Sequence, residues 1–210
     1  MTSDLLSELE FEFSLKPSDL EEFNQLLVSF QGKAIIWDDS TGDEKVIARI
    51  SGQRIDISLA RKSFENLQDL FDSISPEISD LGSHILSNNN CFLESFSKDE
   101  TEETPCGGLV YIAELMVDAD YRNHSIGTEM MKRMSQIVDM NNALVALKAV
   151  PIVDGELEER TPELKKQLKH FYTKLGFHHS GEHYMVKDAR DCHAQRMRAL
   201  AEEGIKPPTT

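Results

Sequence analysis

The 210-residue sequence predicts an α/β fold. Stretches with the period-2 pattern or the continuous apolar character of strands alternate with stretches in which apolar residues recur at helical spacing. The clearest case runs from Leu109 to Leu175, where a strand, a turn, a helix, a second strand and a second helix follow one another. Elements in this order pack helices against a sheet, and this arrangement defines the class.

The composition is that of a globular chain with a packed core. Hydrophobic residues make up 40%, and 22 Lys+Arg against 37 Asp+Glu give a net charge of −15. Phosphate backbones are bound by clustered Lys and Arg, which this chain lacks, so we expect no nucleic-acid partner. We also expect no membrane partner and a cytoplasmic location, because no apolar run approaches ~18 residues and the first residues do not follow the pattern of a secretory signal.

The N-terminal part predicts strands with one helix among them. Alternation over 9–13 indicates a short strand, and apolar periodicity over 20–30, ended by Gly32, indicates a helix. Residues 34–37 and 46–58 are typical of strands, and the polar cluster 38–43 between them predicts a hairpin turn.

The middle of the chain predicts two consecutive helices. Residues 64–74 repeat apolar side chains at helical spacing, and Pro76 begins a second helix that reaches about Leu86. A short strand over 91–96 and a solvated acidic loop around 99–103 are expected to follow.

The C-terminal half carries the strongest pattern. We expect a strand buried on both faces over 109–117, a helix beginning near Ile126 and a strand over 143–150. A helix should then begin with Thr161 as its N-cap, contribute an apolar face up to Leu175 and end at Gly176. After one or two strands, a polar helix is expected over 189–203.

The residues give no sign of a metal site. Cys91, Cys106 and Cys192 are far apart and are best interpreted as reduced thiols. His178, His179 and His183 lack a familiar ligand spacing, because neighbouring residues of a strand point to opposite faces. We interpret them as exposed strand histidines, and the Met130, Met131 and Met134 group as helix packing.

The turn between the strand at 109–117 and the next helix is a candidate anion site. A turn that enters a helix presents unpaired backbone N–H groups and the positive end of the helix dipole. Its sequence runs Tyr121, Arg122, Asn123, His124, Ser125, Ile126, Gly127, Thr128. Residues at such positions often need positive φ, which Asn tolerates and Ser adopts with modest strain.

This turn resembles the acetyl-CoA pyrophosphate loop of the GNAT superfamily of N-acetyltransferases, with Arg122 and Gly127 at matching positions. Ser125 replaces a glycine of the usual pattern, and Asn123 stands where many members have another. The segment 170–177 resembles a second GNAT signature, in which a helix carries Tyr172 four residues before Gly176 and Phe177. The clear resemblance covers 107–188.

The resemblance implies a mixed, mostly antiparallel central sheet that splays near its centre and is flanked by helices on both faces. It further implies acetyl-CoA as co-substrate and no metal. Val117 would supply backbone at the acetyl group, and Tyr172 would protonate the leaving thiolate. Tyr172 also continues an apolar stripe, so a core role is the alternative. The cofactor-binding residues implied are Leu115, Met116, Val117, Arg122, Asn123, His124, Ser125, Ile126, Gly127 and Thr128.

Glu114 is a carboxylate within an otherwise apolar strand. Strict alternation would place it on one face with Ile112 and Met116, opposite Leu115 and Val117. Since an unpartnered buried carboxylate costs several kcal/mol, it should line a wet cleft or meet a cation. A catalytic base, an amine-binding group and a simple rim position all remain open.

The function predicted is transfer of an acetyl group from acetyl-CoA to a primary amine by direct attack in a ternary complex. The amine belongs to a small molecule or to a protein, and acidic loops near it would favour a cation. The alternative is a non-catalytic acyl-CoA-binding or protein-interaction module. The domain organisation expected is an N-terminal elaboration (1–58), a GNAT-like domain (59–188) and a C-terminal helix with a tail (189–210), and a homodimer is possible.

Overall fold

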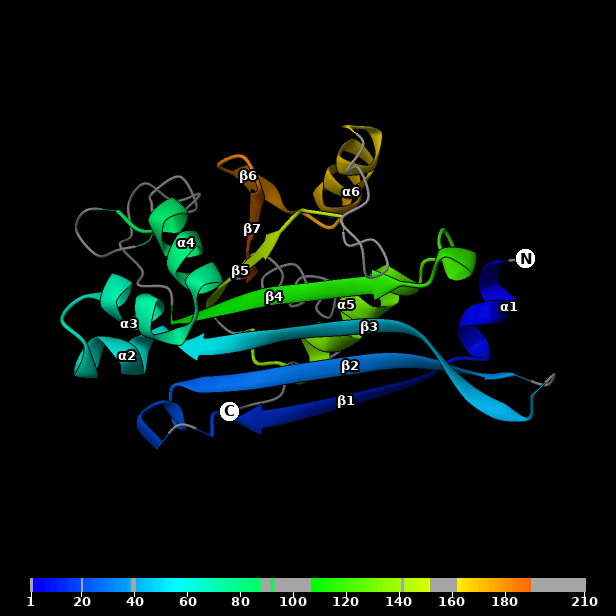
Figure 1. Cartoon of the computed structure of the whole chain (residues 1–210), viewed down its shortest axis with the longest axis horizontal. Coiled ribbons are helices and arrows are strands. Elements are labelled where there is room, and N and C mark those ends of the chain that lie inside the picture. Colours follow the sequence, from blue (N-terminus) through cyan, green and yellow to red (C-terminus); the bar gives the residue numbers. More distant parts are fainter. Residues whose placement is uncertain are drawn as a thin grey trace, which may run out of the picture.

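A computed structural model describes residues 2–19, 21–38, 41–87, 92, 107–140, 142–151 and 162–189. Their centre is one seven-stranded sheet in the order β1-β2-β3-β4-β5-β7-β6 (Figure 1). All neighbouring strands are antiparallel except β4 and β5, which are parallel. The predicted mixed, mostly antiparallel sheet is therefore confirmed. The strands are β1 Glu10–Pro17, β2 Leu27–Asp38, β3 Asp43–Asp56, β4 Gly108–Val117, β5 Ala143–Lys148, β6 His178–Ser180 and β7 Tyr184–Asp188.

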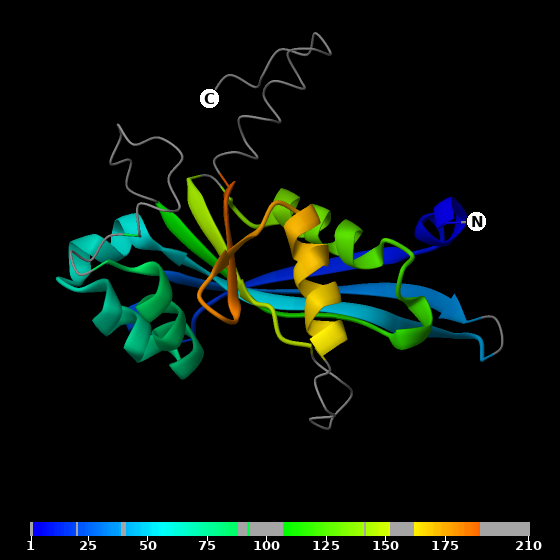
Figure 2. The same cartoon turned by 90° about the horizontal axis from the view of Figure 1, so that it is seen from above.

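Helices cover both faces of this sheet (Figure 2). α5 and α6 pack on one face, and α2, α3 and α4 pack at one end of the other. None of the helices in the described ranges is long and apolar enough to span a membrane. The α-helices are α1 Thr2–Ser7, α2 Ile57–Ser63, α3 Leu67–Ile74, α4 Pro76–Ile85, α5 Ile126–Ile137 and α6 Pro162–Lys174, and short 3₁₀ helices span Glu21–Phe23 and Ala119–Tyr121.

The first three strands form consecutive hairpins, and the turn predicted at 38–43 joins β2 to β3. The helix predicted over 20–30 is wrong. Among the described residues 21–30, only the 3₁₀ turn Glu21–Phe23 is helical, and the chain is already in β2 from Leu27. The apolar spacing has another cause, because Leu27 and Phe30 are buried on opposite sheet faces while pairing with β3. Long-range pairing has overridden the local pattern.

The described part of the connection from β3 to β4 contains three helices, where two were predicted. Each begins at a side chain that accepts a backbone N–H: Asp56 caps α2, Asn66 caps α3 and Ser75 caps α4. Pro76 occupies the first turn of α4, as predicted. Their apolar faces bury Leu109 and Tyr111 of β4. This layer therefore holds the N-terminal half of β4 in place.

The C-terminal half of β4 behaves differently. The β4–β5 pairing runs from Gly108↔Ala143 to Ile112↔Leu147, and β4 then continues to Val117. A bulge at Ala113 shifts the register against β3, where Ser51 pairs with Glu114 and Gly52 with Ile112. The residues up to Ile112 are buried and those after it are partly open, so the strand is not buried on both faces throughout. The predicted splay near the sheet centre is present here.

Several predicted features of the last third are confirmed. The strand at β5, the helix from Pro162 and its end at Gly176, with φ 87°, all occur. His178 and His179 are exposed on β6, and the three methionines of α5 are buried. Three predicted features lie outside the described residues: the strand over 91–96, the N-cap Thr161 and the helix over 189–203. Of these segments only Phe92 and Ala189 are described.

Candidate active site

The turn after β4 adopts the conformation that a close-approach loop requires. Asn123 has φ 65° and Ser125 has φ 63°, both in the left-handed region that favours glycine. Ser125 is the N-cap residue of α5, and its side chain makes no cap hydrogen bond. The first N–H groups of α5 have no partner within the helix, so this end is suited to an anion.

Arg122 and His124 are two loop residues whose side chains carry nitrogen donors or acceptors next to the start of α5. The Arg122 Nε–H donates to the carbonyl oxygen of Val117 at 2.9 Å, which ties the loop to the end of β4. The Nδ1 atom of His124 is buried and has no hydrogen-bond partner within the described part of the chain. A buried polar nitrogen without a partner is rare in a protein.

The first turn of α5 packs against β4 and α6. A Cβ added to Gly127 would lie 3.4 Å from Phe171 Cζ and 3.8 Å from the side chains of Leu115 and Val117. These are ordinary van der Waals distances, so the protein's own packing does not require glycine here. Ile126 is buried as the anchor of the turn, and Thr128 is exposed.

Tyr172 projects from α6 into the core shared with α5. Its ring makes edge contacts with Phe171 and Phe177 at centroid distances of 5.0 and 5.8 Å. The residue is 5% exposed, and burial raises the pKa of its phenol to about 12. The Tyr172 hydroxyl makes no hydrogen bond to any described residue. Its oxygen is not completely buried, so it retains some contact with solvent. A protonated donor is therefore held in an apolar setting beside α5.

The bulge changes the predicted position of Glu114. Val110, Ile112, Leu115 and Val117 all belong to the core on the α5 face, whereas Leu109 and Tyr111 belong to the core under α2–α4. The extra residue therefore places Glu114 and Met116 on the face opposite α5, and the predicted grouping of Glu114 with Ile112 is wrong. Glu114 is partly exposed there, beside a hollow over β1–β4. The prediction that it would line a wet cleft agrees with this position.

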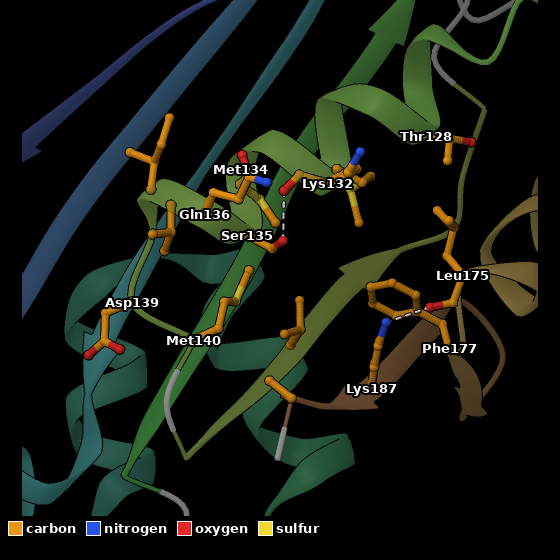
Figure 3. Close-up of a pocket in the computed structure, with 15 residues that line it drawn as sticks. Thr128, Lys132, Met134, Ser135, Gln136, Asp139, Met140, Leu175, Phe177 and Lys187 are labelled. Atoms are coloured by element: carbon orange, nitrogen blue, oxygen red, sulfur yellow. Dashed lines mark hydrogen bonds between the residues drawn. The ribbon is translucent and has the colours of Figure 1, made fainter. Parts of the chain in front are cut away.

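A second hollow, of about 530 Å³, runs along α5 on the other face (Figure 3). It begins at Thr128 in the predicted phosphate loop and extends to Met140 beyond the end of the helix. Lys132 and Ser135 lie on its α5 side, and Phe177 and Lys187 lie across from them (Figure 3). The Lys187 Nζ donates to the carbonyl oxygen of Leu175 at 2.7 Å. A group attached to a phosphate at the start of α5 has room here.

The sequence interpretation missed both lysines. Lys132 lies four residues after Thr128, so one turn of helix brings it to the same side as the loop, and this spacing could have identified it. Lys187 comes from β7, and no local signal connects it to α5. The structure thus brings together the predicted loop, the end of β4 and Tyr172, but separates Glu114 from them by one sheet layer.

The mixed sheet with helices on both faces defines the class as an α/β protein, and the uncapped start of α5, with two left-handed residues before it, is a candidate anion site. Residues 91–179, less than half of the chain, match the family model described as the acetyltransferase (GNAT) domain. The resemblance seen in the loop and around Tyr172 is confirmed by this match. No curated protein matches the chain.

Solved structures with a similar arrangement include Arabidopsis thaliana NAA60 in complex with acetyl-CoA, at 16% identity over 84% of this chain and 97% of that chain, with a TM-score of 0.41. A mutant of KacT covers 90% of this chain and 99% of its own at 11% identity and a TM-score of 0.44. AtaT complexed with acetyl-methionyl-tRNAfMet gives 9% identity, coverages of 89% and 99%, and a TM-score of 0.41. Values this low identify neither a substrate nor a partner of this chain.

Proposed function

We propose that the protein transfers an acetyl group from acetyl-CoA to a primary amine by direct attack in a ternary complex. The observation that carries this proposal is the loop before α5, where two residues in left-handed conformation precede an uncapped helix start beside the open half of β4. Such a loop is suited to a pyrophosphate, and it lies within residues 91–179, which match the acetyltransferase family model.

Acetyl-CoA fits the distribution of charge and space around this loop. Its pyrophosphate would be held by the N–H groups from Ser125 to Thr128 and by the Arg122 guanidinium. Asn123 and Ser125 keep that backbone in its left-handed shape, and Ile126 anchors it. The nucleotide end would extend into the hollow along α5, beside Lys132.

The acetyl end would lie along the part of β4 that has no β5 partner in the described pairing. Beyond Ile112 the strand continues through Leu115, Met116 and Val117 past the last β5 pair. Backbone N–H groups on such an edge can hydrogen-bond an amide-containing arm and the oxyanion formed when the amine attacks the thioester. Leu115 and Val117 face α5, so this arm would be packed on the side of the loop.

The amine must be neutral to attack, whereas an alkyl ammonium with a pKa near ~10 is protonated at pH 7. Glu114 would take that proton directly or through a water molecule. The nitrogen then bonds to the acetyl carbon, the carbon–sulfur bond breaks, and the nitrogen loses a second proton. The thiolate takes up one proton, so the reaction releases one proton overall.

Tyr172 would act on the leaving sulfur. Its phenol, with a pKa of about 12, remains protonated at neutral pH and can donate a hydrogen bond to the developing thiolate. A thiol with a pKa of ~8.5 is the stronger acid, so the phenol stabilises the charge as it forms and hands over its proton only if solvent returns one at once.

The test is calorimetric titration with acetyl-CoA, with CoA and ATP as comparisons, followed by an assay of CoA release with a panel of amines. Micromolar acetyl-CoA binding that weakens in Arg122→Ala, together with amine-dependent CoA release, would support the proposal. Binding without release for any amine would favour a non-catalytic acyl-CoA-binding module, and no binding would favour a protein-interaction module. The partners proposed are acetyl-CoA and an amine, and the absence of a nucleic-acid partner stays a prediction.

A further inference from the structure

Strands β1, β2, β3 and β4 lie side by side (Figure 1), and their pairing aligns two rows of residues on the sheet face opposite α5, with one residue from each strand in each row. Directly paired residues of neighbouring strands share a face, so each row is a line of neighbours. All of these residues except Met116 line a hollow of about 360 Å³. The first row is Glu12, Lys33, Arg49 and Met116, and the second is Ser14, Gln31, Ser51 and Glu114.

Two of the four charges in this hollow satisfy each other. Lys33 Nζ lies 2.7 Å from Glu12 Oε2, and this hydrogen bond, followed by the Glu12 charge, raises the pKa of Lys33. Ser14, Gln31 and Ser51 contribute uncharged hydrogen-bonding groups. Apart from the ion pair and the neutral row, the hollow contains two charged side chains, the exposed Arg49 and the partly exposed Glu114.

Arg49 and Glu114 each lack an ion pair or hydrogen bond with any other described residue. They are diagonal neighbours, because Arg49 pairs with Met116 and Glu114 pairs with Ser51. Diagonal positions are roughly 7–8 Å apart at Cα, which is near enough to share one small ligand. A guanidinium and a carboxylate thus face the same hollow without contacting each other.

We propose that this hollow binds the acceptor, and that the acceptor is a small molecule with a carboxylate close to its primary amine. The proposal rests on the acetyltransferase function proposed above. Glu114 would receive the ammonium group, and Arg49 would hold the carboxylate through two parallel N–H donors. Ser51 and Gln31 would bind polar groups between them. A lysine side chain of a protein has no carboxylate at that distance and leaves Arg49 unmatched.

The position of Glu114 explains how this acceptor reaches the acetyl group from the other face. Glu114 lies directly after the bulge, on the part of β4 that continues past its last β5 pair. Leu115 and Val117, on the same stretch, face α5. An amine bound at Glu114 on one face and an acetyl group along this stretch on the other would therefore meet at the open strand edge.

The experiment compares amino carboxylates with their methyl esters as acceptors, measuring CoA release at saturating acetyl-CoA. We expect kcat/KM to be at least tenfold higher for the carboxylates than for the esters. In Arg49→Ala we expect KM for the carboxylates to rise at least tenfold with kcat little changed, while the esters are unaffected. Arg49→Lys should restore part of the preference, because it keeps the charge but not the two-pronged geometry.

Lys62→Ala is the matched control, since Lys62 is an exposed cation on α2 outside the hollow, and it should leave both acceptors unchanged. Three results would overturn the acceptor class while leaving the acetyltransferase function in place. These are equal kcat/KM for carboxylates and esters, the same loss of kcat/KM for both in Arg49→Ala, or acetylation of peptide amines alone. If no amine is acetylated although acetyl-CoA binds, both proposals are wrong.

Discussion

Arg122 and Val117 are joined by a hydrogen bond of 2.9 Å from the Arg122 Nε–H to the Val117 carbonyl oxygen. The bond fixes the guanidinium at the point where β4 leaves the sheet and the loop begins. Because the Nε–H is engaged with the protein, the two terminal nitrogens keep their donors for a ligand. Arg122 therefore links the position expected for the acetyl group to the position expected for the pyrophosphate.

This link predicts that charge alone does not replace Arg122. Arg122→Lys keeps the positive charge but cannot hold Val117 and a phosphate in the same planar geometry. We expect acetyl-CoA binding to weaken about 3- to 10-fold in Arg122→Lys and more than about 10-fold in Arg122→Ala, as a charge-assisted hydrogen bond of ~1.5–3 kcal/mol is lost. Calorimetry measures both. Equal affinity of the wild type and Arg122→Lys would contradict the dual role.

The left-handed backbone at Ser125 predicts an unusual effect of glycine. Ser125→Gly should relieve strain of roughly 1 kcal/mol, offset in part by the entropy of the unfolded chain, so thermal stability should be unchanged or slightly higher. Acetyl-CoA should bind at least as tightly. Ser73→Gly, in the regular helix α3, is the control and should destabilise by ~0.5 kcal/mol. A comparable loss of stability in both variants would show that the loop conformation is wrong.

Sequence alone was sufficient for the loop and its two helices because the signals there are local. Gly176 ends α6, Pro162 begins it, and the apolar spacing of α5 reflects one buried face. The departures from glycine at Asn123 and Ser125 were visible in the sequence, and the structure places both in left-handed conformation. A positive φ restricts which residue types a position accepts, so a local constraint of this kind can be recognised in the sequence.

The acceptor side was not predictable in the same way. The bulge at Ala113 depends on how β4 pairs with β3, and alternation within one strand cannot reveal it. Arg49 becomes a neighbour of Glu114 only through that register. The same limit explains the error at 20–30, where Leu27 and Phe30 are separated by helical spacing but are buried by strand pairing on opposite faces.

Removing the carboxylate of Glu114 should slow the reaction in a pH-dependent way. Glu114→Gln should lower kcat about 10²-fold or more at pH 7, because a positioned base contributes roughly 10²–10⁴. The deficit should shrink as pH approaches the pKa of the acceptor, ~10 for an alkyl amine, since solvent then supplies the neutral amine. A pH–rate profile tests this, with Asp19→Asn as an exposed carboxylate control. A deficit that is constant with pH would exclude a base.

Tyr172→Phe separates catalysis from packing. The ring contacts with Phe171 and Phe177 remain, and the hydroxyl makes no hydrogen bond to described residues, so stability should hardly change. We expect kcat to fall about 10²-fold with little change in KM for acetyl-CoA. Tyr184→Phe is the control. It removes the 2.7 Å hydrogen bond from the Tyr184 hydroxyl to Asp80 Oδ2, so the free energy of unfolding should fall by about 1–2 kcal/mol while kcat changes little. Full turnover in Tyr172→Phe would remove the acid assignment.

Burial of Tyr172 also predicts how stability depends on alkaline pH. Burial raises its pKa to about 12 from an ordinary value near 10, so the folded protein binds the phenolic proton more tightly than the unfolded chain does. This contribution is fully present below pH ~10 and is lost as pH rises toward 12, by up to about 2–3 kcal/mol. Burial also raises the pKa of Tyr111 and Tyr184, which adds loss in the same direction.

Urea unfolding at pH 8, 10 and 11 measures this loss, and Tyr172→Phe isolates the share of Tyr172. The variant should lose less stability than the wild type between pH 10 and 11, because phenylalanine has no proton to release. If the two proteins lose stability in parallel, the Tyr172 phenol ionises in the folded state as readily as in water. Its hydroxyl would then be well solvated, and the apolar setting on which its role at the leaving sulfur depends would not exist.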